Sequence, residues 1–427
     1  MGENDDWEFD KERKRDHPTT DLDTLIHFLK AAVGTGVLGL PLAFKNSGLS
    51  LGVIFTVIVA IICTHCALIL VKCAHIAYKK MRVTELTFPE VSEAIFANGP
   101  EWGRKYSTSA RISIVVGLFA TYFGSLSVYT VIIAQNFQQV IECHTGYSYN
   151  VRIYISAFLI PLILLTWIPD LKSLAPVSLV ANGFMLISIG ITMYYLVDGI
   201  QSPLDMPQAA YFTEWPMFFS ITIFAMEAIG VVLPLENNMV TPKHLVGICG
   251  ILDMAMIVVT IIYILLGFMG YLKYGDEVLG SITLNLPTED YAAQAVKILV
   301  ALAVFCTFGL QYYVCLEIVW GALKNRFKTH VRFYEYVVRT IITFAAVLLA
   351  VIVPTIGPFM GLIGALCFGF LGLLVPVTLE TVLYYDVGFG PGKWILWKNI
   401  GIFIFGIMAI VFGTHTSMID IIHEYTD

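Results

Sequence analysis

Long apolar segments alternate with short polar gaps along the whole chain. Eleven segments are close to or above the length of about 20 residues that an α-helix needs to cross the hydrocarbon core of a bilayer, which is about 30 Å thick. The pattern therefore predicts an all-α polytopic membrane protein with eleven transmembrane helices. We expect the spans at residues 22–45, 49–77, 110–141, 151–168, 174–197, 215–240, 245–272, 292–319, 334–354, 358–385 and 394–415.

The distribution of Lys and Arg predicts how the chain is oriented. If the N-terminus is cytoplasmic and the spans alternate, 21 of the 25 basic residues fall on the inner side, and only four fall on the outer side. Positive charge accumulates in short cytoplasmic segments. We therefore expect a cytoplasmic N-terminus and a short C-terminus that is extracellular or lumenal.

Composition narrows the class of protein. The 427 residues are 57% hydrophobic and 13% charged, whereas soluble domains are roughly 25% charged. No Walker loop and no HExxH motif is present, so we expect no enzyme, no cofactor, no metal site and no nucleic-acid partner. Residues 1–20 are polar without an apolar run, which excludes a signal peptide and predicts a disordered cytoplasmic arm. Among eight cysteines only Cys143 falls in an outer loop, so no disulfide framework is implied.

The first predicted span carries residues that interrupt helices. The stretch "AAVGTGVLGLPLAF", residues 31–44, holds three glycines and a proline. Each glycine costs a helix roughly 1 kcal/mol relative to alanine, and an interior proline costs about 3 kcal/mol. Backbone groups released inside a bilayer find no water. A break here is therefore expensive and indicates a function, although glycine and proline also serve ordinary packing in membrane helices.

The sixth predicted span repeats the pattern. Residues 228–238 read "AIGVVLPLENN", again with glycine, branched apolar residues and Leu-Pro-Leu. Five spans separate the two motifs, so the second enters the membrane from the opposite side. We predict a five-plus-five inverted repeat over residues 21–197 and 215–385, an outer loop at 198–214, and an eleventh helix with a short outer C-terminus at 386–427. Interrupted helices at matching positions of inverted halves indicate a transporter's substrate site.

Three motifs resemble those of a known family. "LIHFLKAAVGTGVLGLPLAFKNSG", "EAIGVVLPLENNM" and "LQYYVCLEI" are similar to motifs of the proton-coupled amino acid transporters in the amino acid/auxin permease superfamily. The resemblance implies a leucine-transporter-type fold with discontinuous helices 1 and 6, and symport of small neutral amino acids with protons. This chain departs from the family pattern at Cys315 and Leu316, where proline and alanine are usual, and at Ala228, where glycine is usual. These departures leave the substrate open.

The predicted breaks suit a zwitterionic substrate. A helix that restarts after a break presents free N–H groups and a positive dipole end to a carboxylate. We expect the amino acid carboxylate at the backbone of Gly34, Thr35, Gly36 and Val37, and its ammonium at carbonyls between Phe224 and Ala228. Further pocket walls are expected from Tyr122, Phe123, Ile229 and Tyr313, and a crowded aromatic pocket favours glycine, alanine or proline. The alternative role for each aromatic residue is ordinary packing. The alternative for the Thr35 hydroxyl is a hydrogen bond to the backbone of its own helix.

Two ionisable residues are the candidates for proton coupling. Ionisable groups inside a membrane are functional candidates by default. His27 lies seven residues before Gly34, and a histidine side chain changes charge between about pH 5 and 8. Glu227 adjoins the second break and offers a carboxyl group that can carry a proton. A purely structural hydrogen bond is the alternative for both.

Two other functions stay open at this point. One is a sodium-coupled neutral amino acid transporter of the same fold. The other is an amino-acid-sensing receptor with low flux, whose nutrient-signalling partners would bind the N-terminal arm. Tyrosine sorting patterns at Tyr78 and Tyr384 leave the plasma membrane and the lysosomal membrane as alternative locations.

Overall fold

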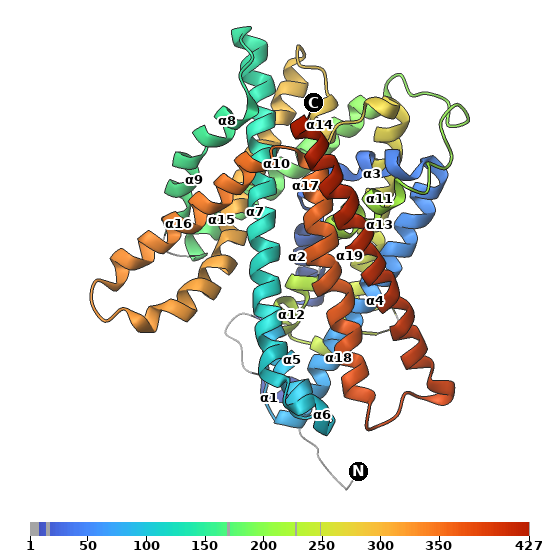
Figure 1. The fold of residues 1–427 in the computed structure, drawn as a ribbon, viewed down its shortest axis with the longest axis vertical. Helices are drawn as coiled ribbons and strands as arrows, with labels where there is room; N and C mark the ends of the chain where they lie inside the picture. Colours follow the sequence, from blue (N-terminus) through green and yellow to red (C-terminus); the bar gives the residue numbers. More distant parts are fainter. Residues whose placement is uncertain (1–7, 14–17, 169–170, 227–228, 248, 427) are drawn as a thin grey trace.

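The computed structural model describes residues 8–13, 18–168, 171–226, 229–247 and 249–426. Within these ranges the regular structure is helical, apart from one isolated bridge between Thr19 and Met239. Figure 1 shows α7 running through nearly the whole height of the bundle, with α8, α9 and α16 on one side and α4, α18 and α19 on the other. The long uninterrupted helices are α4 (Leu49–Met81), α7 (Ser107–Thr145), α10 (Leu171–Val197), α13 (Ile251–Tyr274), α15 (Tyr291–Leu323), α16 (Val331–Ile352) and α19 (Trp394–Thr426).

The helices confirm a multi-pass membrane protein. In the described part of the chain, nine helices are long and apolar enough to cross a membrane, and ten if one bent pair is counted as a single span. The predicted fourth span corresponds to α8 (Val151–Ala157) and α9 (Leu159–Thr166), which together form a shorter apolar helix. Eleven spans result only if this shorter helix also crosses, so the exact count stays a prediction.

The first span is interrupted between two helices. The helix α2 (Asp21–Ala32) ends before Gly34, whose backbone is extended at φ −96° and ψ −158°. A short 3-10 helix, η1 (Thr35–Gly39), and the helix α3 (Leu40–Ser47) follow, and the direction changes by 44°. Pro41 lies in the first turn of α3, where its missing N–H costs no helical hydrogen bond.

The predicted break in the sixth span falls on residues 227–228, outside the described part of the chain. The helix α11 (Trp215–Ala225) is followed by α12 (Ile229–Asn238), which contains Pro234. Glu227 and Ala228, between the two, lie outside the described residues. Another composite element joins α17 (Ile356–Ile363), the π-helical stretch η5 (Gly364–Leu374) and α18 (Val375–Tyr384).

Shorter elements cover the two ends of the bundle. They are α1 (Phe9–Glu12), α5 (Phe88–Ala97), α6 (Glu101–Arg104), η2 (Pro242–Leu245), η3 (Gly275–Glu277), α14 (Ile282–Asn285), η4 (Lys324–Arg326) and η6 (Pro391–Lys393). Figure 1 shows α1 at the end of the bundle opposite to the C-terminal end of α19.

Part of the N-terminal arm is ordered, which differs from the expectation of a disordered segment over residues 1–20. Phe9 of α1 is 1% exposed and packs against the rings of His75 and Tyr78. Arg13 donates to the Thr84 carbonyl at 2.9 Å and lies 3.3 Å from the fully buried carboxylate of Glu236. The Phe9 ring and the Arg13–Glu236 ion pair therefore dock residues 8–13 against α4 and α12. The sequence pattern does not predict these contacts, because the partners lie far away in the sequence.

Candidate functional site

A cavity of about 330 Å³ lies beside the interruption of the first span. Its volume falls in the range of about 300–1,000 Å³ that is usual for small-molecule sites. The elements α2, η1, α7, α10, α11, α12 and α15 supply its walls. The lining residues that matter below are His27, Lys30, Gly34, Thr35, Gly36, Tyr122, Tyr129, Asn182, Met185, Phe224, Ala225, Thr307 and Gln311.

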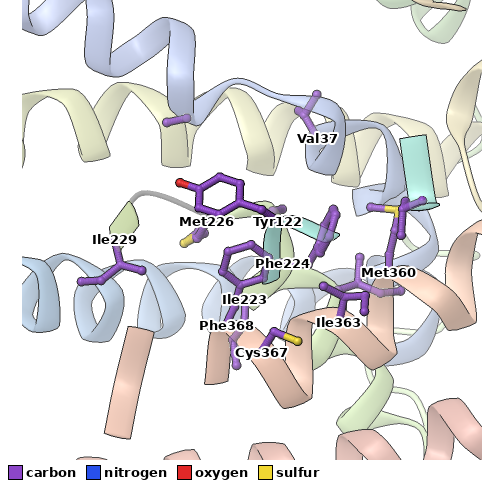
Figure 2. Close-up of a cluster of buried hydrophobic side chains, with 14 of the residues drawn as sticks. Val37, Tyr122, Ile223, Phe224, Met226, Ile229, Met360, Ile363, Cys367 and Phe368 are labelled. Atoms are coloured by element: carbon purple, nitrogen blue, oxygen red, sulfur yellow. The ribbon is translucent and has the colours of Figure 1, made fainter. Parts of the chain in front are cut away.

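The interrupted first span and the sixth predicted span touch through their backbones. A Cβ atom added to Gly36 would lie 2.5 Å from the Cα atom of Ala225, at the end of α11. No real side chain tolerates such a contact, so glycine is required for this approach. A Cβ added to Gly230 would likewise lie 2.5 Å from the Tyr122 hydroxyl. Figure 2 shows Tyr122 in the buried cluster together with Val37, Phe224 and Met226.

Backbone groups at the break offer hydrogen bonds of both kinds. The Gly34 N–H already donates to the Ala32 carbonyl at 2.8 Å. The first amides of η1, beginning with Thr35 and Gly36, have no acceptor within their own helix. The carbonyl of Ala225, at the end of α11, accepts a hydrogen bond from the Tyr263 hydroxyl at 2.6 Å. The break therefore presents hydrogen-bond donors at the start of η1 and an acceptor at the end of α11.

Gln311 adds an acceptor inside the cavity. Its Oε1 atom is buried and has no hydrogen-bond partner among the described residues, and its side chain lines the cavity from α15. A buried carboxamide oxygen without a partner costs about 1–3 kcal/mol. That cost is recovered if a bound molecule donates to it.

The structure brings several predicted residues together at this cavity. Six of them line it: His27, Gly34, Thr35, Gly36, Tyr122 and Phe224. His27 and Lys30 lie one turn apart on α2, and His27 is exposed. Glu227 and Ala228 lie outside the described residues, so their predicted roles stay predictions.

Four predicted residues lie elsewhere. Val37 is fully buried behind the cavity wall. The ring of Phe123 stacks on that of Phe119, with 5.5 Å between the ring centroids. Ile229 lines a separate, small apolar cavity. Tyr313 faces the guanidinium of Arg339, with 5.5 Å between the guanidinium carbon and the ring centroid. A helix presents only one face to a cavity, and the sequence does not show which face that is.

The sequence reasoning missed the wall that α10 forms and the polar residues of α15. Asn182, Thr307 and Gln311 are isolated polar residues in long apolar spans. Such residues tend to face the bundle interior or a cavity rather than lipid, and that signal identifies them. Tyr129 carries no comparable signal, because aromatic residues are frequent throughout these spans.

Membrane-length helices surround a partly polar cavity at an interrupted span, an arrangement typical of a transporter. A family model described as "Transmembrane amino acid transporter protein" matches residues 17–419. The chain belongs to this family, and this confirms the resemblance to the amino acid/auxin permease superfamily.

Two relatives and one solved structure extend the comparison. The chain is 54% identical to "Proton-coupled amino acid transporter-like protein pathetic" of Drosophila melanogaster, over 97% of this chain and 88% of the relative. It is 26% identical to "Amino acid transporter ANT1" of Arabidopsis thaliana, over 94% and 93% of the two chains. A structure titled "Inward facing conformation of Mhp1" covers 94% of this chain and 93% of its own, with a TM-score of 0.52 and 14% identity. The last similarity concerns the fold alone. Together these findings identify a secondary amino acid transporter.

Proposed function

We propose that the protein is a proton-coupled symporter of small neutral amino acids, of the glycine, alanine and proline class, and that it works by alternating access. The observation that carries the proposal is the cavity of about 330 Å³ against the interruption at Gly34–Gly36. The name of the Drosophila relative supports proton coupling.

The cavity suggests how the two charges of the substrate are bound. We assign the carboxylate to the amides of Thr35 and Gly36, because the Gly34 amide is already bonded to Ala32. The positive end of the helix dipole favours the same placement. We assign the ammonium group to the Gln311 Oε1 atom and to the second lone pair of the Ala225 carbonyl.

The apolar part of the wall suggests the size of the substrate side chain. Tyr122, Tyr129, Phe224 and Met185 line the same cavity, and large rings leave little room beyond the backbone of a bound amino acid. This favours substrates with short side chains, since a longer one would have to displace a ring.

Coupling is assigned to His27 and Glu227. His27 is at the cavity and on the same helix face as Lys30, so its charge acts on the space through which the substrate passes. Glu227 remains a candidate from its place in the sequence, next to the end of α11. Protonation of either group changes the net charge at the cavity by one unit, which couples substrate release to the proton.

The wider architecture is part of the proposal. We propose eleven spans with an inverted repeat of residues 21–197 and 215–385, and a cytoplasmic N-terminus. The location is the plasma membrane, the lysosomal membrane or both. Two alternative functions compete with this proposal: a sodium-coupled transporter of the same fold and a receptor with low flux. The experiment below distinguishes them from a proton-coupled symporter.

Uptake of radiolabelled glycine, alanine, proline and larger amino acids into proteoliposomes tests the proposal. We expect accumulation of the small substrates that requires an inward proton gradient and persists without sodium. The His27→Ala variant should reduce gradient-driven accumulation while equilibrium exchange of substrate continues. Accumulation that follows a sodium gradient, or binding without turnover, would contradict the proposal.

A further inference from the structure

Tyr263 places one hydroxyl group between the first and the sixth predicted spans. It lies in the middle of α13 and is fully buried. Its hydroxyl oxygen is 2.5 Å from the carbonyl oxygen of Ala32 and 2.6 Å from that of Ala225. Ala32 is the last residue of α2, and Ala225 is the last residue of α11. The Ala32 carbonyl also accepts from the Gly34 N–H at 2.8 Å, and the two carbonyls share the single proton of the Tyr263 hydroxyl. One side chain therefore contacts the ends of both helices.

The backbone of α13 holds this hydroxyl in place. A Cβ atom added to Gly267 would lie 2.5 Å from the ring of Phe44, and one added to Gly270 would lie 2.4 Å from Pro41. Both partners belong to α3, the second half of the first span. Because α13 packs this closely on α3, the Tyr263 ring cannot retreat from the junction without moving the helix.

The hydroxyl occupies a position that a cation takes in other transporters. Its distances of 2.5 and 2.6 Å to the two carbonyl oxygens are those of short O–H···O hydrogen bonds, whose range is about 2.5–3.0 Å. In transporters with broken helices, unwound carbonyls and helix C-terminal ends commonly coordinate a sodium ion or a proton. The hydroxyl here occupies the point between two such carbonyls.

We propose that the Tyr263 hydroxyl takes the place of a metal cation at this junction. It shares its one proton between the last carbonyls of α2 and α11, holds these two helix ends in register, and removes the need for sodium there. This inference rests on the proposed proton-coupled function and deepens it. Tyr263 is a positioning residue, because it acts through Ala32 and Ala225, which line the cavity, and does not line the cavity itself.

The Tyr263→Phe variant removes the hydroxyl and keeps the ring. Its matched control is Tyr312→Phe, which also removes a buried hydroxyl-to-carbonyl bond, the one to Arg339 at 2.9 Å, but away from the breaks. We expect Tyr263→Phe to lower proton-driven uptake in proteoliposomes by about tenfold or more, because the carbonyls of Ala32 and Ala225 lose the hydroxyl that joins them. Tyr312→Phe should stay within about twofold at equal amounts of folded protein. Equal uptake by the two variants would overturn the inference.

A second variant tests directly whether the Tyr263 hydroxyl takes the place of a cation. Tyr263→Asn shortens the side chain, opens the space between the two carbonyls, and contributes an oxygen ligand. We expect replacing choline by sodium to raise both uptake and the thermal unfolding temperature of the purified Tyr263→Asn variant, and to change neither in the wild type. The unfolding measurement remains informative if this variant transports poorly. Equal values in sodium and choline would overturn the proposed substitution.

The two proposals fail in different ways. If the wild-type protein does not accumulate amino acids on a proton gradient, the proposed function is wrong. If the wild type accumulates them but Tyr263→Phe behaves like Tyr312→Phe, only the role of Tyr263 is wrong.

Discussion

At the scale of single residues, the cavity depends on a glycine without a Cβ atom and on a buried acceptor without a donor in the described part of the chain. Gly36 has no Cβ and so lets two backbones meet, and Gln311 has an acceptor without a donor among the described residues. Predicted residues such as Phe123 and Tyr313 instead have aromatic or cationic neighbours outside the cavity. A group whose interactions are already satisfied gains little from a substrate, whereas an unsatisfied buried group gains the full bond.

We expect the Gln311→Leu variant to bind amino acids more weakly. A hydrogen bond to a charged group contributes about 1.5–3 kcal/mol, so KM for uptake should rise by about tenfold or more if Gln311 accepts from the ammonium. Gln138→Leu is the control, because Gln138 contacts Glu142 and the Tyr149 carbonyl at the far end of α7. Concentration-dependent uptake in proteoliposomes measures both. An unchanged KM for Gln311→Leu would contradict the assignment of Gln311.

At the scale of elements, the N-terminal arm is docked by α1 and its charges. Lys243 of η2 lies 2.9 Å from the Asp10 carboxylate. Burial is the largest single influence on Asp10 and raises its pKa, but the hydrogen bond from Lys243, a backbone hydrogen bond and the charges of Lys243 and Lys11 together outweigh burial, so the pKa of Asp10 is lowered. The hydrogen bond to Asp10 in turn raises the pKa of Lys243. Each charge is therefore more favourable when the arm is docked than when it is released.

The signs of these shifts predict when the arm is released. A carboxyl with a lowered pKa stabilises docking above its ordinary pKa of about 3.9 and loses this effect as the pH falls below it. A lysine with a raised pKa stabilises docking below its ordinary pKa of about 10.4 and loses the effect as the pH rises above it. Docking should therefore stay constant from about pH 5 to 9 and weaken in stronger acid or base.

Docking of the arm can be followed by the fluorescence anisotropy of a dye attached to the cysteine of a Glu12→Cys variant. The exposed Cys143 and Cys249 are replaced by serine so that the dye reacts at position 12. We expect constant anisotropy between about pH 5 and 9 and a decrease below about pH 4. The Lys243→Met variant should show lower anisotropy already at neutral pH, whereas Lys393→Met, in the turn before α19, should not. A titration centred near neutrality would show that other groups control the arm.

The element scale also shows how far sequence patterns reach. The predicted break near Gly34 coincides with the end of α2 and the start of η1, because glycine and proline act locally on the backbone. The 44° bend and the contact of Gly36 with Ala225 do not follow from that pattern. They depend on how α3, α11 and α13 pack together.

At the scale of the whole molecule, one buried cation joins three helices. Arg339 of α16 is 2% exposed. It donates to the carbonyls of Thr166 and Ile168 at 2.6 and 3.0 Å and pairs with Glu335 at 2.7 Å. Its own carbonyl accepts from Tyr312 of α15 at 2.9 Å. The free end of α9 is thereby capped from α16, and both helices are tied to α15, which forms part of the cavity wall.

We expect the Arg339→Met variant to be markedly less stable. The substitution leaves the buried carbonyls of Thr166 and Ile168 without this donor, at a cost of about 1–3 kcal/mol for each unsatisfied acceptor, whereas the partly exposed Glu335 carboxylate can bind water. Arg332→Met is the control, because Arg332 is exposed on the same helix. Thermal unfolding of the two purified proteins in detergent measures the difference. Equal unfolding temperatures would show that the network adds nothing to stability.

The sequence by itself determined the class of the protein, its apolar spans, the position of the first break and the family. Each of these depends on local composition or on spacing along one helix, which the order of residues fixes directly. Only the tertiary structure decided that α10 and Gln311 form part of the cavity, that Tyr313 turns to Arg339, that residues 8–13 dock on Glu236, and that Tyr263 bridges two helix ends. Some of these contacts join residues that are more than 200 positions apart in the sequence. The direction of each side chain follows from helix packing, which a local sequence pattern does not predict.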